Sequence, residues 1–296
     1  MAAEVLCVGE VLWDSLPAGL FLGGAPFNVA CHLRAAGISA AMVSRIGDDR
    51  LGEEIIRRAA RYGVATDLVQ VDPTLRTGFV RVLLDDLGSA AYEIVAPAAW
   101  DAISLNDDLL QRANAARAIV FGSLAQRDAI TRATIERLWE SKALMVFDAN
   151  LRPPFDDRDV VRRSLERADV VKLSHVELEK LTEWFGLPSD IRAAATALAD
   201  RFGCNTVCVT RSREGAVMWR DGVWSEHDGF EVEVRDTVGA GDAFLAVLLA
   251  GILSGSPDSV VLKHANLIGA YVATQDGAVP TDQSAAIAQA VQPTRR

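Results

Sequence analysis

The sequence predicts an α/β fold in which helices cover both faces of a central, mostly parallel β-sheet, with a small β-sheet added to it. Short apolar runs alternate with amphipathic helical stretches along the chain. The runs are apolar at every position, which is typical of strands buried on both faces. One segment, residues 77–95, alternates with a period of two instead and predicts an antiparallel hairpin.

Composition suits a chain with one large core. Of the 296 residues, 50% are hydrophobic and 24% are charged. We expect residues 1–296 to form a single domain, with a lid from about residues 14–23 and 77–96 inserted in it. The net charge of −10 argues against nucleic acid or an anionic membrane as a partner. The longest apolar run, Ala243 to Leu253, is too short to span a bilayer, and the first residues lack the basic segment of a secretory signal. We therefore expect a cytoplasmic protein.

Four cysteines are scattered through the chain without a Cys-x-x-Cys pair. They are Cys7, Cys31, Cys204 and Cys208, and two of them lie in apolar, strand-like runs. Buried, reduced thiols are therefore expected rather than a zinc site.

The first part of the chain begins with a strand at Val5 to Val8 that ends at Gly9. A helix is expected from Pro26 to Ala36, because Pro favours the first helical turn and Gly37 follows as a stop. A strand at residues 41–46 and a helix at residues 51–62 continue the alternation. The β-like segment at residues 77–95 follows, with Asp85-Asp86-Leu87-Gly88 as its turn. Such a hairpin is either a lid over a ligand or an ordinary edge hairpin, and both interpretations stay open.

The rest of the chain repeats the same rhythm. The expected strands are residues 118–121, 144–147, 170–173 and 206–209, followed by a hairpin at 217–224 around Asp221-Gly222. The expected helices are residues 129–139, 160–168, 177–185, 191–202, 243–253, 260–274 and 284–291.

A glycine-rich turn, Asp236 to Asp242, precedes the apolar helix at 243–253. Small residues let the backbone approach a reacting group, and the free amides at a helix N-terminus form an anion hole. An acidic residue beside an anion hole makes sense if a hydroxyl lies between them. Asp242 would then take the proton while the amides hold a transferring phosphoryl group. The alternative is that Asp242 is only an N-cap.

Three further segments place polar groups at strand or helix ends. Residues 23–30 follow Asp14, and Asn28 offers a donor and an acceptor to a polyol, or is merely an exposed Asn. Residues 148–152 end a strand, so Arg152 could reach a phosphate or a sugar oxygen. Residues 172–177 end the next strand, and Glu177 would either orient the water shell of Mg²⁺ or cap a helix.

In this order the four segments resemble the ribokinase-like (PfkB-type) carbohydrate kinase family. The resemblance runs from Gly9-Glu10 to Pro280-Thr281, and residues 236–242 are similar to the family's C-terminal signature. It implies a ribokinase-like α/β kinase domain with a small lid, which phosphorylates a sugar hydroxyl with ATP. It also implies Mg²⁺ and, in many members, a monovalent cation, usually potassium.

Matching positions carry the family's residue roles. The catalytic centre implied in this way consists of Asp242 as base, with Gly239, Ala240 and Gly241 as the anion hole for the γ-phosphate. Sugar contacts are implied at Asp14, Gly23, Gly24 and Asn28, with Arg152 beside them. ATP contacts are implied at Ser174, Thr210, Arg211, Ser212, Gly215, Gly241 and Asn266. Glu177 would act on Mg²⁺ through water, and the cation loops would be Asp236, Val238, Val272, Gln275, Gly277 and Thr281.

The Gly-Gly-Ala-Pro segment and the residues 148–154 resemble the fructokinase-like branch, so fructose is the expected acceptor. Ribokinases usually have Lys where this chain has Ala25. The alternatives are 2-keto-3-deoxygluconate, ribose, a nucleoside or an aminoimidazole riboside, and, in another class, a non-catalytic sugar or nucleotide sensor.

Two departures from the family pattern stand out. Only eight residues separate Asp14 from Gly23, so the lid is expected to shrink to the hairpin at 77–95 plus a short piece around residues 20–22. Members of the family often dimerise by pairing their lids. With so small a lid, a monomer and a homodimer both stay open. Gln275 replaces the Arg or Lys often found in the cation loop, which contacts such ions mainly through carbonyl groups.

Overall fold

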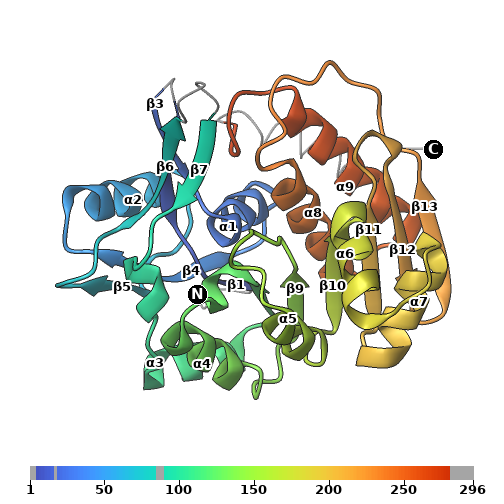
Figure 1. Ribbon diagram of the computed structural model, residues 1–296, viewed down its shortest axis with the longest axis horizontal. Coiled ribbons are helices and arrows are strands. Elements are labelled where there is room, and N and C mark those ends of the chain that lie inside the picture. Colours follow the sequence, from blue (N-terminus) through green and yellow to red (C-terminus); the bar gives the residue numbers. More distant parts are fainter. Residues whose placement is uncertain (1–4, 17–18, 85–89, 281–296) are drawn as a thin grey trace.

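A large twisted sheet forms the centre of the computed structural model, which describes residues 5–16, 19–84 and 90–280 (Figure 1). Within these residues, nine strands pair in the order β13-β12-β11-β10-β9-β8-β1-β4-β5. All neighbours are parallel except β11-β12 and β12-β13 at one edge. The bounds are β1 (Val5–Val8), β4 (Ala40–Gly47), β5 (Val69–Asp72), β8 (Ala118–Gly122), β9 (Leu144–Asp148), β10 (Val170–Ser174), β11 (Thr206–Thr210), β12 (Ala216–Arg220) and β13 (Val223–His227). The mostly parallel sheet and the hairpin around Asp221-Gly222 are therefore confirmed.

Helices cover both faces of this sheet, as predicted. One face carries α1 (Ala25–Ala35), α2 (Arg50–Arg61), α8 (Ala240–Ser254) and α9 (Asp258–Ala273), and the other carries α3 (Asp107–Ala115), α4 (Ala129–Leu138), α5 (Arg158–Leu165), α6 (His175–Phe185) and α7 (Ile191–Phe202). The side chains of β1 alternate between the two cores, with Val5 and Cys7 in one and Leu6 and Val8 in the other. Continuous apolar strands are needed because both faces are buried.

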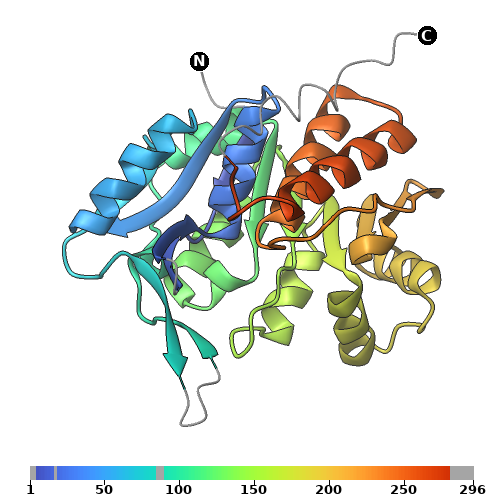
Figure 2. The same ribbon diagram turned by 90° about the horizontal axis from the view of Figure 1, so that it is seen from above.

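A second, four-stranded sheet projects from the body (Figure 2). It consists of β2 (Leu12–Leu16), β3 (Gly19–Gly23), β6 (Gly78–Leu84) and β7 (Ala90–Ile94), in the order β3-β2-β6-β7. The antiparallel pairing of β6 with β7 confirms the predicted hairpin, whose turn lies outside the described residues. The short piece expected around residues 20–22 lies within β3. Strand β2 was not predicted: residues 12–16 pair antiparallel with residues 19–23 along their full length.

Some elements were not predicted. Helix α3 buries only Leu109 and Ala113, so its apolar period is weak, although Asn106 caps it by accepting a hydrogen bond from the Leu109 amide. Strand β5 and the short 3-10 helices at residues 99–102, 124–126 and 212–214 were also missed. The helix predicted at 284–291 lies outside the described residues.

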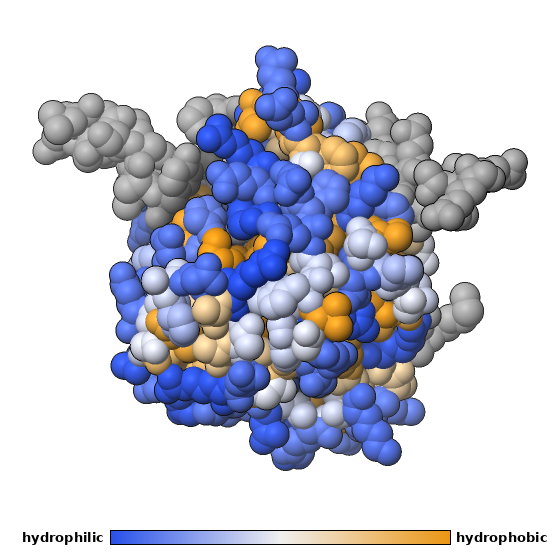
Figure 3. Space-filling model, turned by 90° about the vertical axis from the view of Figure 1, so that its right-hand side faces the viewer, coloured by the Kyte–Doolittle hydropathy of each residue, from blue (hydrophilic) through white to orange (hydrophobic). Residues whose placement is uncertain are grey.

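The surface and the thiols agree with the composition. All four cysteines are buried and carry free thiols. Over the described part of the chain, no helix is long and apolar enough to cross a membrane. The face seen in Figure 3 is largely hydrophilic, with apolar residues scattered over it. Single exposed apolar side chains of this kind are ordinary on a protein surface.

Candidate active site

The glycine-rich turn leads directly into α8, and Asp242 lies in the first turn of that helix. Gly239 is the N-cap residue and has a left-handed φ of 78°. A Cβ on Gly239 would lie 2.5 Å from the Cα of Ala278, so only glycine fits there. The alternative that Asp242 is an N-cap is wrong, and its carboxylate stands beside helix amides that have no intrahelical partner.

Asn28 connects the start of α1 to the start of α8. Its Nδ2 donates a hydrogen bond of 2.8 Å to Oδ2 of Asp242. Asn28 is only 4% exposed, which overturns the alternative of an exposed Asn at a helix start. Its Oδ1 is buried and has no hydrogen-bond partner among the described residues. The Asn28 side chain therefore keeps a hydrogen-bond acceptor for a ligand while its amide nitrogen bonds the Asp242 carboxylate.

Glu10, Asp14, Asn28 and Arg152 form what we call the α1 polar cluster. Burial raises the pKa of the Asp14 carboxyl to about 6, and the positive charge of Arg152 opposes this. Burial also raises the pKa of Glu10 to about 7, with Arg152 lowering it and Asp242 raising it. A Cβ on Gly24 would lie 2.4 Å from the Glu10 carbonyl oxygen, and one on Gly23 would lie 2.6 Å from Asp14 Oδ2. Both glycines therefore let the backbone approach these carboxyl-bearing residues closely.

A buried ion pair lies beside the first turn of α8. Lys172 Nζ is 3.0 Å from Oδ1 of Asp148, and their side chains are 8% and 5% exposed. Burial alone would lower the pKa of Lys172, but the carboxylates of Asp148, Glu177 and Asp242 outweigh it and raise that pKa. Burial raises the pKa of Asp148 to about 6 against the opposing effect of Lys172. A Cβ on Gly241 would lie 3.1 Å from Lys172 Nζ, so this cation adjoins the residues predicted to form the anion hole.

Ser174 and Glu177 form a capping box at the start of α6. Glu177 Oε2 accepts hydrogen bonds from Ser174 N at 2.7 Å and from Ser174 Oγ at 2.9 Å. Glu177 Oε1 accepts one of 2.8 Å from the amide of Leu151. The helix-cap alternative is thus confirmed, and the same carboxylate also fixes the loop that carries Arg152. Its role toward Mg²⁺ stays a prediction.

A cavity of about 1140 Å³ opens on the other side of α8. We call it the β11 cavity, because its wall includes the end of β11 and the loop after it. The predicted nucleotide contacts that line it are Thr210, Arg211, Ser212, Gly215, Gly241 and Asn266, and Ala240 of the predicted anion hole lines it as well. Apolar side chains on its wall include Phe230, Val232 and Phe244. Ser174 is absent from this wall, although the adjacent His175 lines it.

The predicted cation loops meet through Asp236. Its Oδ1 accepts a 3.0 Å hydrogen bond from the Val238 amide, and its Oδ2 accepts one of 3.2 Å from the Gly277 amide. Val272 is fully buried, and Gln275 donates to the hydroxyl of Thr274. Thr281 lies outside the described residues.

Sequence reasoning assigned no role to Lys172 or to Glu10. Lys172 had a usable signal, because it is a charged residue inside the apolar strand Val170–Ser174. Glu10 directly follows β1 and Gly9 and gave no signal of its own. In the folded protein Glu10 is only 3% exposed.

A family model described as pfkB family carbohydrate kinase matches residues 18–285. The chain belongs to this family. A fructokinase from Klebsiella pneumoniae is 30% identical to it, over 94% of this chain and 96% of that protein.

Solved structures of such kinases share the fold. A fructokinase from Vibrio cholerae, solved with fructose, ADP and calcium ion, is 27% identical with a TM-score of 0.82 and covers 98% of this chain and 99% of that one. A sugar kinase from Pyrococcus horikoshii in complex with ATP is 25% identical with a TM-score of 0.80, over 96% and 99% of the two chains. This pfkB family member is an ATP-dependent sugar kinase with a ribokinase-like fold.

A divalent metal accompanies ATP in such a reaction, and the residues present fit that role. In the described part of the chain, no group of three or more His, Cys, Asp or Glu residues could hold a metal ion by itself. Magnesium needs no such group, because it is usually bound by substrate phosphates, water and one or two carboxylates. Glu177 can supply such a carboxylate, since each of its oxygens has lone pairs beyond the hydrogen bonds described above.

Proposed function

We propose that this kinase phosphorylates fructose, with Asp242 as the general base. The observation that supports the role of Asp242 best is its hydrogen bond with Asn28, because it joins the α1 polar cluster to the start of α8. The fructokinases among the relatives support fructose as the acceptor. The β11 cavity, on the other side of α8, would take ATP.

In this mechanism the sugar hydroxyl attacks the γ-phosphorus of ATP. The new O–P bond forms as the bond from phosphorus to the β,γ-bridging oxygen breaks, and ADP leaves with that bond's electron pair. The hydroxyl proton passes to a carboxylate oxygen of Asp242. Asn28 holds Oδ2 of that carboxylate, which orients the base toward the acceptor.

The charge of the transferring group would meet the first amides of α8, at Ala240 and Gly241. Gly239 lets the chain turn into that helix. Lys172 adds a buried positive charge beside Gly241. Magnesium, held by the phosphates and through water by Glu177, would neutralise phosphate charge.

The sugar itself would bind at the α1 polar cluster. Asp14 can accept hydrogen bonds from vicinal hydroxyls, Asn28 Oδ1 can accept another, and Arg152 can donate to a sugar oxygen. Gly23 and Gly24 would let the ligand approach the backbone. The four-stranded sheet that contains Asp14 would then serve as a lid inserted in a single kinase domain. We also propose that the loops joined by Asp236 bind a monovalent cation through carbonyl oxygens, with potassium the expected ion.

The test is ADP release from MgATP with fructose, ribose, 2-keto-3-deoxygluconate, adenosine and an aminoimidazole riboside as separate acceptors. Asp242→Asn should keep ATP binding and lose about 10²- to 10⁴-fold in turnover. Asp221→Asn is the matched control, since it makes the same change at an exposed turn.

Turnover on fructose, lost only in Asp242→Asn, would support the proposal. Turnover on another acceptor alone would replace fructose and keep the base. A rise in melting temperature with ATP, without turnover on any acceptor, would favour a sensor. Repeating the assay with potassium replaced by sodium or lithium tests the cation.

A further inference from the structure

Arg127 is a buried arginine that the mechanism above does not use. It follows the 3-10 helix Leu124–Gln126, after β8. Its Nε and Nη2 each lie 2.8 Å from a different carboxylate oxygen of Asp101. Both side chains are only 6% exposed. A buried, two-point pair of this kind holds the guanidinium in a fixed plane, which a lysine cannot reproduce.

Two aromatic rings lie within stacking range of this guanidinium. Its central carbon is 3.9 Å from the ring centre of Trp100 and 4.7 Å from that of Phe155. Trp100 is fully buried, and Phe155 packs against the same core. Arg127, Asp101, Trp100 and Phe155 thus form one cluster, which we call the Arg127 cluster. Cation–π contacts of a desolvated arginine with such rings are favourable.

This cluster touches both chain segments that connect the β6-β7 hairpin of the four-stranded sheet to the body. Strand β7 ends at Ile94, and the next residue, Val95, accepts a 2.8 Å hydrogen bond through its carbonyl oxygen from Arg127 Nη2. Strand β6 begins at Gly78, where a Cβ would lie 2.5 Å from Trp100 Nε1. The chain therefore enters β6 against the indole ring and leaves β7 against the guanidinium.

The same cluster touches the loop that carries Arg152. The amide of Phe155 donates a 2.8 Å hydrogen bond to the carbonyl oxygen of Arg152, which closes the turn between them. The ring of Phe155 then extends from that turn to Arg127. One side chain thus contacts the base of the small sheet and the turn beside Arg152, which are distant in sequence.

We propose that Arg127 is a positioning residue that fixes the small sheet and the Arg152 loop relative to each other, and so shapes the acceptor side of the site. Asp14 stands on the small sheet and Arg152 on the loop, and the positive charge of Arg152 acts on Asp14. A sugar that contacts both needs them at a set separation. This inference rests on the proposed binding of the acceptor at the α1 polar cluster.

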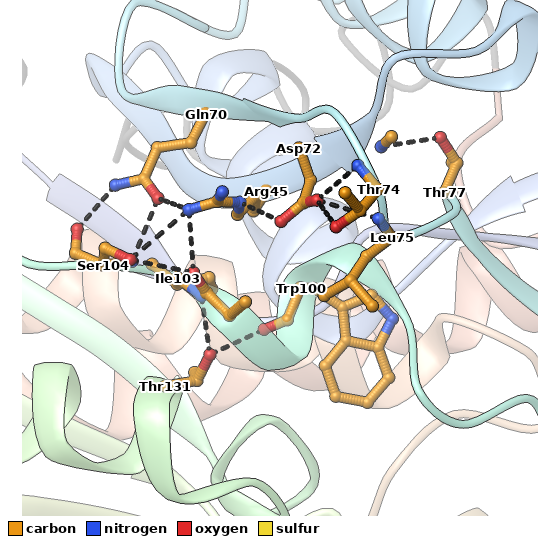
Figure 4. Close-up of polar contacts among 12 residues, drawn as sticks. Arg45, Gln70, Asp72, Thr74, Leu75, Thr77, Trp100, Ile103, Ser104 and Thr131 are labelled. Carbon is orange, nitrogen blue, oxygen red and sulfur yellow. Dashed lines mark hydrogen bonds and ion pairs between the residues drawn. The ribbon is translucent and has the colours of Figure 1, made fainter.

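Arg45 provides a matched control (Figure 4). It lies on β4, its Nε is 2.8 Å from Oδ2 of Asp72, and its Nη1 donates to the carbonyl oxygen of Ala102 at 3.1 Å. Asp72 in turn fixes the turn at Thr74 and Leu75, just before β6. Arg45 is thus a second arginine paired with an aspartate near the base of the small sheet, and among the described residues none of its hydrogen bonds or ion pairs reaches the Arg152 loop.

The experiment compares Arg127→Lys with Arg45→Lys under steady-state conditions. Arg127→Lys should raise KM for the acceptor about tenfold, with KM for ATP and kcat changed by less than about twofold. Arg45→Lys should leave the acceptor KM within about twofold of the wild type. An equal rise in both KM values of Arg127→Lys, or the same acceptor effect in Arg45→Lys, would overturn the proposal.

A second measurement does not need turnover. Amide hydrogen exchange of the wild type and Arg127→Lys should show faster exchange at residues 78–81 and 151–156 together, and Arg45→Lys should not affect 151–156. Faster exchange at both segments in Arg127→Lys supports the coupling even if fructose is not the acceptor. Unchanged exchange at residues 151–156 would refute the coupling, whereas failure of every acceptor in the panel would refute only the proposed function.

Discussion

The two sides of the active site are built in different ways. In the α1 polar cluster, Glu10 and Asn28 are buried, Asp14 is partly buried and Arg152 is exposed. Asn28 acts directly on the neighbouring Asp242 through a hydrogen bond. The β11 cavity is wide and is lined by loop residues and by the first turn of α8. Arg211 on its wall forms a partly exposed ion pair with Glu226.

This contrast matches the two ligands of a sugar kinase. A sugar offers several hydroxyl groups, and discrimination among sugars requires buried polar partners whose loss is costly. A nucleotide offers phosphates and a flat base, which helix amides and apolar walls can hold with fewer buried charges. We therefore expect changes in the cluster to alter specificity and rate, and changes in the cavity to alter nucleotide affinity mildly.

The largest effect is expected at the ion pair that lies between the two sides. Lys172→Met leaves Asp148 buried without its partner, which should lower the free energy of unfolding by about 3–5 kcal/mol. Denaturant unfolding measures this. Adding Asp148→Asn removes the uncompensated charge and should restore part of the loss. A single variant as stable as the wild type would mean that the pair is not buried.

A smaller effect is expected where the cluster meets the base. Asn28→Ala removes a hydrogen bond to a charged carboxylate and should lower kcat about 10- to 100-fold, with KM for ATP unchanged. Asn28→Asp removes the same donor and places a like charge beside Asp242, so kcat should fall at least as far as in Asn28→Ala. Asn266→Ala, in the β11 cavity, should instead raise KM for ATP and leave kcat nearly unchanged.

Binding of the acceptor at the α1 polar cluster should also depend on pH, whereas binding of ATP in the β11 cavity should not. The pKa of Asp14 is about 6, so KM for the acceptor should rise as the pH falls below 6, while KM for ATP stays level. Asp14→Asn should abolish this dependence, and a parallel change in both KM values would contradict it.

The raised pKa values of Glu10 and Asp14 should also affect how the stability of the protein depends on pH. Glu10 and Asp14 have folded pKa values of about 7 and 6, above their ordinary values. Between about pH 4 and 7 the folded state therefore holds protons that the unfolded state has released, so these two groups make stability fall as the pH rises. Replacing Glu10 with Gln should flatten that fall in a series of melting temperatures.

The smallest effect is expected on the cavity side. Glu226→Gln breaks the partly exposed pairs with Arg211 and Arg192, which are worth at most about 1 kcal/mol. KM for ATP should change by less than about fivefold and the acceptor KM not at all. A larger change, or one in the acceptor KM, would show that the two sides are not separate.

Much of the fold followed from local pattern. Strands such as Val170–Ser174 are apolar because both faces are covered, and helices such as Ile191–Phe202 have caps that can be read directly. The strand pair β2-β3 was underestimated because only its pairing with β6 gives those residues a sheet to join. Helix α3 was missed because it buries few side chains.

The candidate site was likewise predictable from the sequence only in part. The sequence by itself determined the glycine-rich turn, the start of α8 and the order of the polar segments, because these depend on backbone geometry and on neighbouring residues. Only the tertiary structure decided that Asn28 bonds Asp242, that Lys172 and Asp148 pair behind Gly241, and that Arg127 joins the small sheet to the Arg152 loop. Each of these contacts unites residues from distant segments, and burial and charge at such positions depend on what else packs there.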